Sequence, residues 1–342
     1  MAVLVAAAVV ALPGGYAARA AQVTELKIAT VLPENTQWMK GMRAGAAEIE
    51  QRTDGRVQFK FYSGGIQGNP QTVLRKIKIG QLQGGAFTPT DLQDVYPDLN
   101  IYGLPFLFES AEEASYVREV IDPKLAAGLE DAGFVSFGFA TAGFARIMSN
   151  VPIRSHEDLR GRKVWVPEGD LISYQAMQAL DLSPVTLPIT DVLTGLQTGL
   201  IDIVAMSPAG ALVLQWHTRV DYITRMPIVY SMGLLAIDRR AFGRIAEADQ
   251  AVVREVMSGL YARWDVENQR DAEEAMQALI NAGLEPVDPA PGERERLEAI
   301  MAETNLEMAR EGIISLDLLQ EIRGLIDQYR DRHPASEPAP AE

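Results

Sequence analysis

The chain has 342 residues, which is more than one hydrophobic core usually supports and suits two lobes of ordinary domain size. Its 31 Lys and Arg against 46 Asp and Glu give a formal charge of −15, which argues against nucleic acid or an anionic membrane as the main partner. Because the chain has no cysteine and three histidines, disulfides and thiol chemistry are excluded, and no cofactor or His-based metal or catalytic centre is expected.

The N-terminal stretch has the features of a signal peptide. Residues 1–12 are almost purely small and apolar, and Ala18-Arg19-Ala20 offers an A-x-A cleavage site. The apolar run is too short for a permanent bilayer anchor. Residues 1–20 are therefore predicted to direct export to the periplasm and to be cleaved near Ala20, with no direct membrane insertion of the mature protein.

The next part of the chain predicts a βαβαβ series. Residues 26–31 are typical of a buried strand, and a helix with one apolar face is expected from Thr36. Residues 57–62 alternate as a strand, Asn69-Pro70 begins a second helix, and residues 85–87 form a third strand. This order favours one lobe with a parallel sheet.

Two apolar, β-prone runs are longer than an ordinary strand. Residues 134–147 and 226–237 both exceed the usual length of about five or six residues. Strands that outlast one sheet are candidates for crossings between two lobes. Before the first run, Ser110 and Glu113 have the spacing of a capping box and predict the start of a helix.

A second βαβ series is expected between these two runs. Its predicted strands are 163–166, 183–187 and 201–206, and its predicted helices are 173–180 and 190–197.

The C-terminal third is predicted to be helical. Residues 249–281 contain no proline and carry an apolar stripe, so they predict a helix roughly 50 Å long, enough to run along both lobes. Helices are also expected at 293–310 and 316–330. The low-complexity tail, residues 331–342, is predicted to be disordered.

The stretch from Gly143 to Pro167 contains the most informative residues. Arg146 lies near a predicted strand boundary, and the capping-box pair Ser155 and Asp158 opens a short helix. The chain then returns as a strand that carries Trp165. A guanidinium and a flat aromatic side chain at strand ends are suited to holding a small planar anion in a crevice.

This stretch resembles the extracytoplasmic solute-binding proteins of TRAP transporters (tripartite ATP-independent periplasmic transporters), the DctP-like family. The family pattern has an arginine, Ser-Asn, Pro-Ile, Asp-Leu-x-Gly-x-Lys, a hydrophobic residue, a second arginine and Val-Pro. Here the pattern runs from Arg146 through Asp158-Leu159 to Val166-Pro167. Trp165 stands where the family usually has its second, carboxylate-clamping arginine. The resemblance covers nearly the whole mature chain.

Together the elements and the resemblance indicate an α/β chain with the two-lobed periplasmic-binding-protein fold. The lobes are discontinuous, joined by hinge strands and spanned by one long helix. We expect lobe I to comprise 21–143 plus 230–270, and lobe II to comprise 144–229 plus 271–330.

The resemblance implies a binding protein, not an enzyme, that closes over a small organic acid. It would deliver that acid to the small and large subunits of a TRAP membrane permease. Because Trp165 replaces a cation by a large apolar face, the predicted ligand is a monocarboxylate with an apolar or aromatic body.

The resemblance also implies roles for individual residues. Arg146 would bind the ligand carboxylate, Trp165 would cover its apolar part, and Ser207 would add a hydrogen bond; a core position for Trp165 is the alternative. Thr88 matches a position where the family offers a cleft side chain. The remaining ligand-binding predictions rest on placement in the chain: Asn35, Trp38, Phe87 and Trp216, the last equally suited to core packing.

Two other functions stay open at this point. The solute-binding component of an ATP-driven importer would have the same two-lobed design. An exported α/β enzyme has less support, because the chain lacks a G-x-S-x-G elbow, an H-E-x-x-H motif and a Cys–His pair. No catalytic and no metal-binding residue is predicted.

Overall fold

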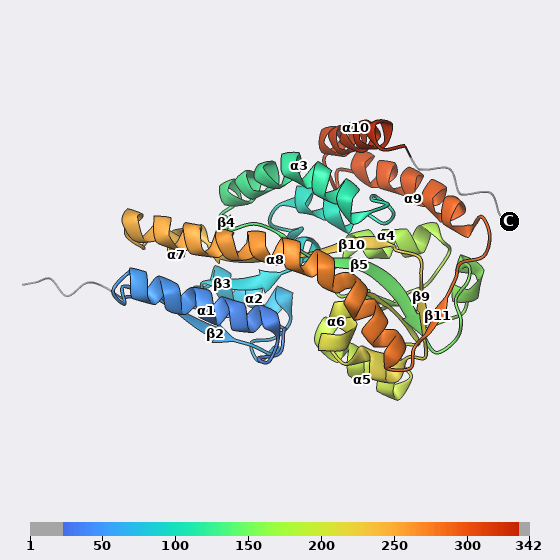
Figure 1. Ribbon diagram of the computed structural model, residues 1–342, viewed down its shortest axis with the longest axis horizontal. Helices are drawn as coiled ribbons and strands as arrows, with labels where there is room; N and C mark the ends of the chain where they lie inside the picture. The colour runs from blue at the N-terminus through green and yellow to red at the C-terminus, as the bar shows by residue number, and fades with distance from the viewer. Residues whose placement is uncertain (1–22, 335–342) are drawn as a thin grey trace, which may run out of the picture.

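The computed structural model describes residues 23–334 and shows two α/β halves side by side (Figure 1). The predicted signal peptide, residues 1–20, and residues 335–342 of the predicted tail lie outside the described residues. One long helix, α8 (Glu247–Asn281), runs along both halves. The two-lobed α/β fold expected from the sequence is therefore confirmed.

The first half contains the predicted βαβαβ series. Thr36 Oγ1 accepts a hydrogen bond from Met39 N, and Asn69 Oδ1 accepts one from Thr72 N, so both helices begin where their capping residues predict. The first strand, residues 24–29, pairs in parallel with the strands at residues 57–62 and 84–87. The elements are β1 (Thr24–Ala29), α1 (Gln37–Arg52), β2 (Val57–Tyr62), α2 (Pro70–Lys78) and β3 (Gly84–Phe87).

The chain next forms two 3₁₀ turns and a long helix. These are η1 (Pro89–Leu92), η2 (Pro97–Gly103) and α3 (Ala111–Asp131). Ser110 caps α3 by accepting from Glu113 N. The predicted return bond of the capping box is not made, because Glu113 Oε1 accepts from Glu109 N instead.

Two long strands connect the halves. The predicted strand 134–147 is interrupted at Gly138, whose φ of 126° only glycine adopts readily, and becomes β4 (Phe134–Ser136) and β5 (Ala140–Ser149). The second run forms β10 (Val229–Asp238). β10 pairs antiparallel with β3 of the first half and with β5, while β5 pairs with two strands of the second half. One continuous sheet therefore passes from one half to the other.

The second half contains short strands and helices around β5. β8 and β9 pair with β5, β11 pairs with β9, and β6 pairs in parallel with β7. The elements are η3 (His156–Leu159), β6 (Trp165–Pro167), α4 (Leu171–Ala179), β7 (Val185–Leu187), η4 (Ile189–Asp191), α5 (Val192–Thr198), β8 (Ile203–Met206), α6 (Pro208–Val213), η5 (Trp216–Arg219), β9 (Tyr222–Thr224) and β11 (Glu285–Val287). The short helix α7 (Arg239–Phe242) follows β10 and packs on β4 and β10 in the first half.

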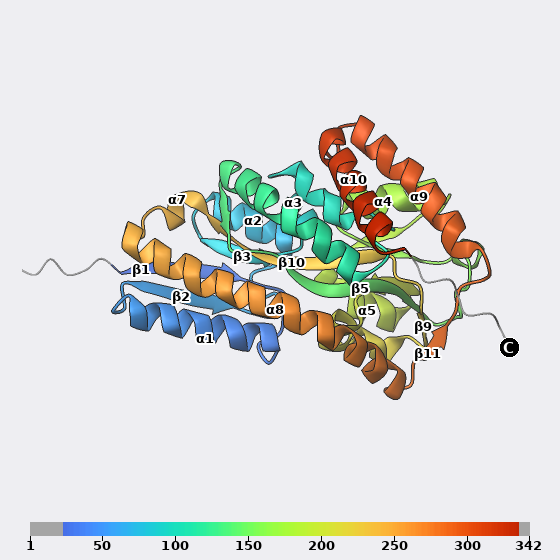
Figure 2. The same ribbon diagram turned by 45° about the horizontal axis from the view of Figure 1, so that its top comes forward.

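The last two helices, α9 (Glu293–Arg310) and α10 (Leu316–Arg332), lie over α4 and α3 (Figure 2). Two residues of the predicted disordered tail, Asp331 and Arg332, belong to α10. Lys124 of α3 pairs with Glu321 of α10. The final helix thus packs against a helix that we assigned to lobe I.

Helix α8 packs tightly on the first half and then continues to the second. The Trp264 indole stacks on Trp38 with ring centroids 5.7 Å apart. A Cβ on Gly41 would lie 2.5 Å from the Trp264 ring, so only glycine allows this close approach of α1 and α8. Farther along, α8 contacts α6 and β5. The helix therefore packs on both halves and on the connecting strand β5.

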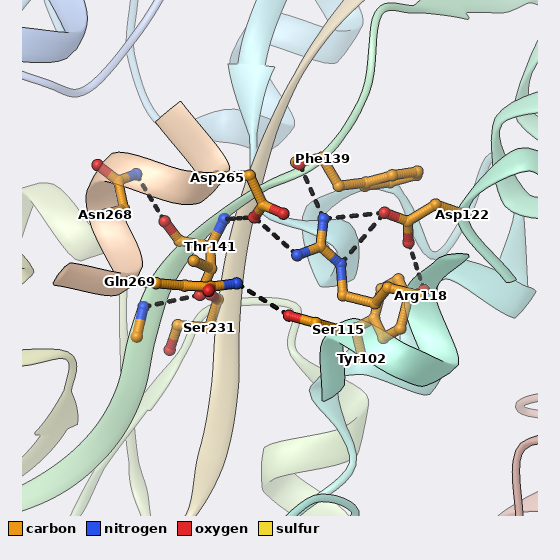
Figure 3. A network of polar contacts seen from close by, with 11 residues as sticks. Tyr102, Ser115, Arg118, Asp122, Phe139, Thr141, Ser231, Asp265, Asn268 and Gln269 are labelled. Atoms are coloured by element: carbon orange, nitrogen blue, oxygen red, sulfur yellow. Dashed lines mark hydrogen bonds and ion pairs between the residues drawn. The ribbon is translucent and has the colours of Figure 1, made fainter. Parts of the chain in front are cut away.

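A buried polar network joins α3, β5 and α8 (Figure 3). Arg118 is 5% exposed and donates to the carboxylates of Asp122 and Asp265 and to the carbonyl oxygen of Phe139. Asp265 also accepts from Thr141 N at 3.0 Å. Each carboxylate compensates part of the cost of burying the guanidinium.

We expect Asp265→Ala to lower the free energy of unfolding by about 2–4 kcal/mol, because it removes one of two counter-charges from a buried Arg118. Urea unfolding followed by circular dichroism measures this change. The control is Asp288→Ala, which breaks an exposed ion pair with Arg225 and should change stability by no more than about 0.5 kcal/mol. Equal effects of the two substitutions would contradict a structural role for the network.

Candidate functional site

A cleft of about 430 Å³ lies between the two halves. The carboxyl ends of β1, β3, β6 and β8 open onto it, and β5 and β10 contribute the segments that cross between the halves. This is the position at which open α/β sheets bind ligands. The lining includes residues 30–32, Trp38, residues 69–71, residues 86–91, Tyr102, residues 140–142, Ala145, Ile147, residues 164–168, Asp170, residues 203–207 and residues 228–234.

Five of the eight predicted ligand-binding residues line this cleft. They come from both halves of the molecule. In the sequence they lie up to 169 positions apart, from residue 38 to residue 207. The five are Trp38, Phe87, Thr88, Trp165 and Ser207.

Trp165 is a cleft wall and a core residue at once. Its indole Nε1 donates to the carbonyl oxygen of Leu187 at 3.0 Å, and the side chain is 4% exposed. Behind it, Trp216 packs edge-to-face with ring centroids 5.1 Å apart. Trp216 is itself buried and absent from the lining, so it supports Trp165 and does not reach the cleft.

Ser207 and Thr88 both occupy helix-cap positions. Ser207 Oγ accepts from Gly210 N at the start of α6. Thr88 precedes η1, and its backbone N and its hydroxyl both donate to Asp91. The capping and the cleft-lining roles predicted for Ser207 are therefore compatible.

Arg146 does not reach the cleft. Its strand neighbours Ala145 and Ile147 line the cleft, so the alternation of side chains along β5 turns Arg146 to the other face. There its guanidinium donates to the carbonyl oxygen of Arg225. Burial lowers the pKa of Arg146, and the charge of Arg225 adds to that effect. The geometry gives no support to Arg146 as the ligand's anchor.

Asn35 is also outside the cleft, in the exposed turn before α1. Its predicted role rests on its position shortly after the first strand. After Asn35 the chain reaches the cleft again only at Trp38, three residues later. Position after a strand is therefore not enough to identify a cleft residue.

Sequence reasoning missed two carboxylates that line the cleft from opposite halves. Asp91 belongs to η1, and its Oδ2 accepts from Thr88. Asp170 caps α4 by accepting from Ser173 N at 3.0 Å and from Ser173 Oγ at 2.7 Å. The capping patterns Thr88-x-x-Asp91 and Asp170-x-x-Ser173 are visible in the sequence. The sequence does not reveal that both carboxylates face one cleft.

Both carboxyl groups are easier to protonate than usual. Burial raises the pKa of Asp91 to about 6, against the hydrogen bonds from Thr88, and the charge of Asp170 raises it further. Burial also raises the pKa of Asp170, against the hydrogen bonds from Ser173. Among the described residues that line the cleft, no cation lowers these two pKa values.

The rim of the cleft is bridged by contacts between the halves. Asn69 Nδ2 donates to the Glu168 carboxylate at 2.7 Å, and Gln71 Nε2 donates to the Glu168 carbonyl oxygen at 2.9 Å. Gln93 donates to the carbonyl oxygen of Gly169. These contacts join residues near 70 and 93 to the loop after β6, and they hold the halves together over the cleft.

Comparison with known proteins identifies the family. The profile of the DctP family, described as bacterial extracellular solute-binding protein, family 7, matches residues 28–311. That range is more than half of the chain. The chain belongs to this family.

Relatives and solved structures agree with this family and its fold. A solute-binding protein of a Sulfitobacter strain is 24% identical over 313 residues, 90% of this chain and 93% of its own. A Ralstonia eutropha TRAP periplasmic solute-binding protein, solved with (S)-2-acetolactate, has a TM-score of 0.82 at 20% identity and covers 89% and 99% of the two chains.

A Bordetella pertussis extracytoplasmic solute receptor that binds pyroglutamic acid matches over 89% of this chain and all of its own. Its TM-score is 0.81 at 20% sequence identity. Both structures share the two-lobed fold of this DctP-family chain.

We expect Asp91→Asn to change how stability depends on pH. Because the pKa of Asp91 is higher in the native protein than the usual value of about 3.9, native Asp91 contributes most below pH 4, and its contribution is lost as the pH rises through about 6. From pH 4 to pH 8 the wild type should lose on the order of 1–3 kcal/mol relative to the variant.

Urea unfolding of both proteins at several pH values measures this difference. Asp94→Asn, an exposed carboxyl in the same segment, is the matched control. A difference between wild type and Asp91→Asn that stays constant from pH 4 to pH 8 would contradict the raised pKa.

Proposed function

We propose that this DctP-family chain is the extracytoplasmic solute-binding component of a TRAP-type secondary transporter. It captures a small molecule between its two halves and delivers it to the small and large subunits of a membrane permease. The observation that carries the proposal is the cleft of about 430 Å³, which lies at strand carboxyl ends and is bridged at its rim by contacts between the halves. A binding protein, not an enzyme, fits the family to which the chain belongs.

The ligand has a substantial apolar body. Most side chains that line the cleft are apolar, among them Phe87, Trp165 and Met206. Burial of such a body between closed halves supplies binding free energy at roughly 25 cal/mol per Å². The sequence predicts a monocarboxylate with an apolar or aromatic body, and the apolar lining supports the part of that prediction that concerns the body. The part that concerns the carboxylate rests on Arg146 as its binding partner, and Arg146 lies outside the cleft.

Export to the periplasm is part of the proposal and rests on residues 1–20, whose A-x-A motif suits cleavage near Ala20. Within residues 23–334, no helix combines the length and the apolar character that a bilayer crossing requires.

The lobe boundaries are proposed as 21–143 plus 230–270 and 144–229 plus 271–330. The packing of α10 on α3 is a contact of lobe II with lobe I in this division. Closure of the cleft would then be a rotation of the halves about β5 and β10.

A thermal-shift screen of small molecules, followed by mass spectrometry of the stabilising compound, tests the proposal. A binding protein is stabilised by a compound that is recovered unchanged. Recovery of a chemically converted compound would favour an enzyme.

With a saturating amount of the stabilising compound, small-angle scattering should show a smaller radius of gyration than without it, because the halves close over the ligand. An unchanged radius at saturation would contradict closure.

Glu168→Ala should weaken binding of that compound about threefold to tenfold and increase its dissociation rate. The substitution removes the acceptor for Asn69 at the rim and so destabilises the closed state. Calorimetry and stopped-flow fluorescence measure the two quantities. Glu295→Ala, an exposed carboxylate on α9, is the control. Unchanged binding by Glu168→Ala would show that the rim contact has no part in closure.

A further inference from the structure

In the part of the chain that the structure describes, the cleft lining offers no cation to pair with an acid. Among residues 23–334, the charged side chains that line it are Asp91, Glu168 and Asp170, and no Lys, Arg or His joins them. Arg118 lies beyond the lining, and its guanidinium is already shared between Asp122, Asp265 and the Phe139 carbonyl oxygen. With one cation and two carboxylates, that network adds a further negative charge near Thr141 and Tyr102.

Several hydrogen-bond donors of the cleft are also engaged within the protein. The Trp165 indole N–H donates to Leu187, and the Tyr102 hydroxyl donates to Asp122. The amide of Asn268 donates to the carbonyl oxygen of Thr141. Among the described lining residues, a ligand carboxylate would therefore find only neutral donors.

Two backbone N–H groups of the kind that receive an anion are taken by the protein's own carboxylates. Thr88 N, before η1, donates to Asp91, and Ser173 N, in the first turn of α4, donates to Asp170. One such position on each side of the cleft is thus filled by the protein's own acid group.

The cleft nevertheless has features that call for a ligand. Trp38, Phe87, Tyr102, Trp165 and Tyr230 give it an aromatic lining from both halves. Tyr230 is 2% exposed, and its hydroxyl has no hydrogen-bond partner among the described residues. A buried hydroxyl without a partner is costly, and a polar group of a bound molecule would satisfy it.

We propose that the cleft selects a solute with no negative charge, whose apolar body carries a hydrogen-bond-donating head group, best matched by an organic ammonium that lies between Asp91 and Asp170. This inference rests on the proposed solute-binding function and names its ligand class. The solved relatives described above were obtained with acids, so the chain departs from them in the charge of its ligand.

Electrostatics gives the direction of this preference. A carboxylate that enters a closed cleft loses its hydration and meets like charges without a counter-ion, which costs free energy. An ammonium meets two carboxylates from opposite halves and the faces of aromatic rings, both of which attract a cation. Because the carboxylates belong to different halves, the same cation would favour the closed state.

Three probes with one apolar body test the inference by calorimetry at pH 7.5: 3-phenylpropylammonium, 3-phenylpropanamide and 3-phenylpropanoate. We expect the ammonium to bind at least about tenfold more tightly than the acid, with the amide between them. Tightest binding of the acid would overturn the inference and leave the solute-binding function intact. So would tight binding of any acid from a wider screen when the ammonium does not bind.

Failure of every compound in a library of acids, amides and amines to bind would overturn the solute-binding function itself, and this inference with it. That outcome differs from the preceding one, in which an acid binds.

Two isosteric variants test the role of the carboxylates. Asp91→Asn and Asp170→Asn both retain a side-chain oxygen for capping and remove one charge. Each should weaken binding of the ammonium about tenfold and leave binding of the amide within about threefold. Asp94→Asn, on the exposed surface, is the control. An equal loss for ammonium and amide would indicate a merely structural role and would overturn the assignment of Asp91 and Asp170.

Discussion

The antiparallel pairing of β5 with β10 is the constraint on which the rest of this structure depends. Since β10 also pairs with β3 and β5 also pairs with β8, one sheet belongs to both halves. The cleft is formed where this shared sheet passes between them. The Arg118 network then fixes α3 and α8 to the start of β5, so the connecting segment is held by charge as well as by backbone pairing.

Much of the architecture could be predicted because its signals are local. Thr36, Asn69 and Ser110 cap helices through bonds three residues away, and a pattern of such short range is visible in the sequence. The helix α8 was predictable for a similar reason, since its apolar stripe is uninterrupted by proline. The interruption of the long strand at Gly138 was missed because a single glycine within an apolar run does not reveal its φ.

The site was only partly predictable, since side-chain direction in a strand depends on register. Arg146 and Ala145 are neighbours in the chain, yet one faces away from the cleft and the other lines it. A shift of one residue reverses this assignment, and a sequence pattern of arginine followed by Ser-Asn does not fix it. Asp91 and Asp170 were missed for another reason. Each has a sufficient local explanation as a cap, and their meeting across the cleft follows only from the packing of the halves.

The two tryptophans on the second half have a consequence for how the protein discriminates among solutes. Trp165 is held by its bond to Leu187 and by the edge of Trp216, which is itself fully enclosed. A wall that is fixed from behind cannot rearrange around differently shaped molecules. It serves as a rigid template, so solutes of equal charge are sorted by their contour. To change the ligand shape that the cleft prefers, Trp216 would have to be replaced together with Trp165. Substitution of Trp165 alone, the side chain that faces the cleft, would not suffice.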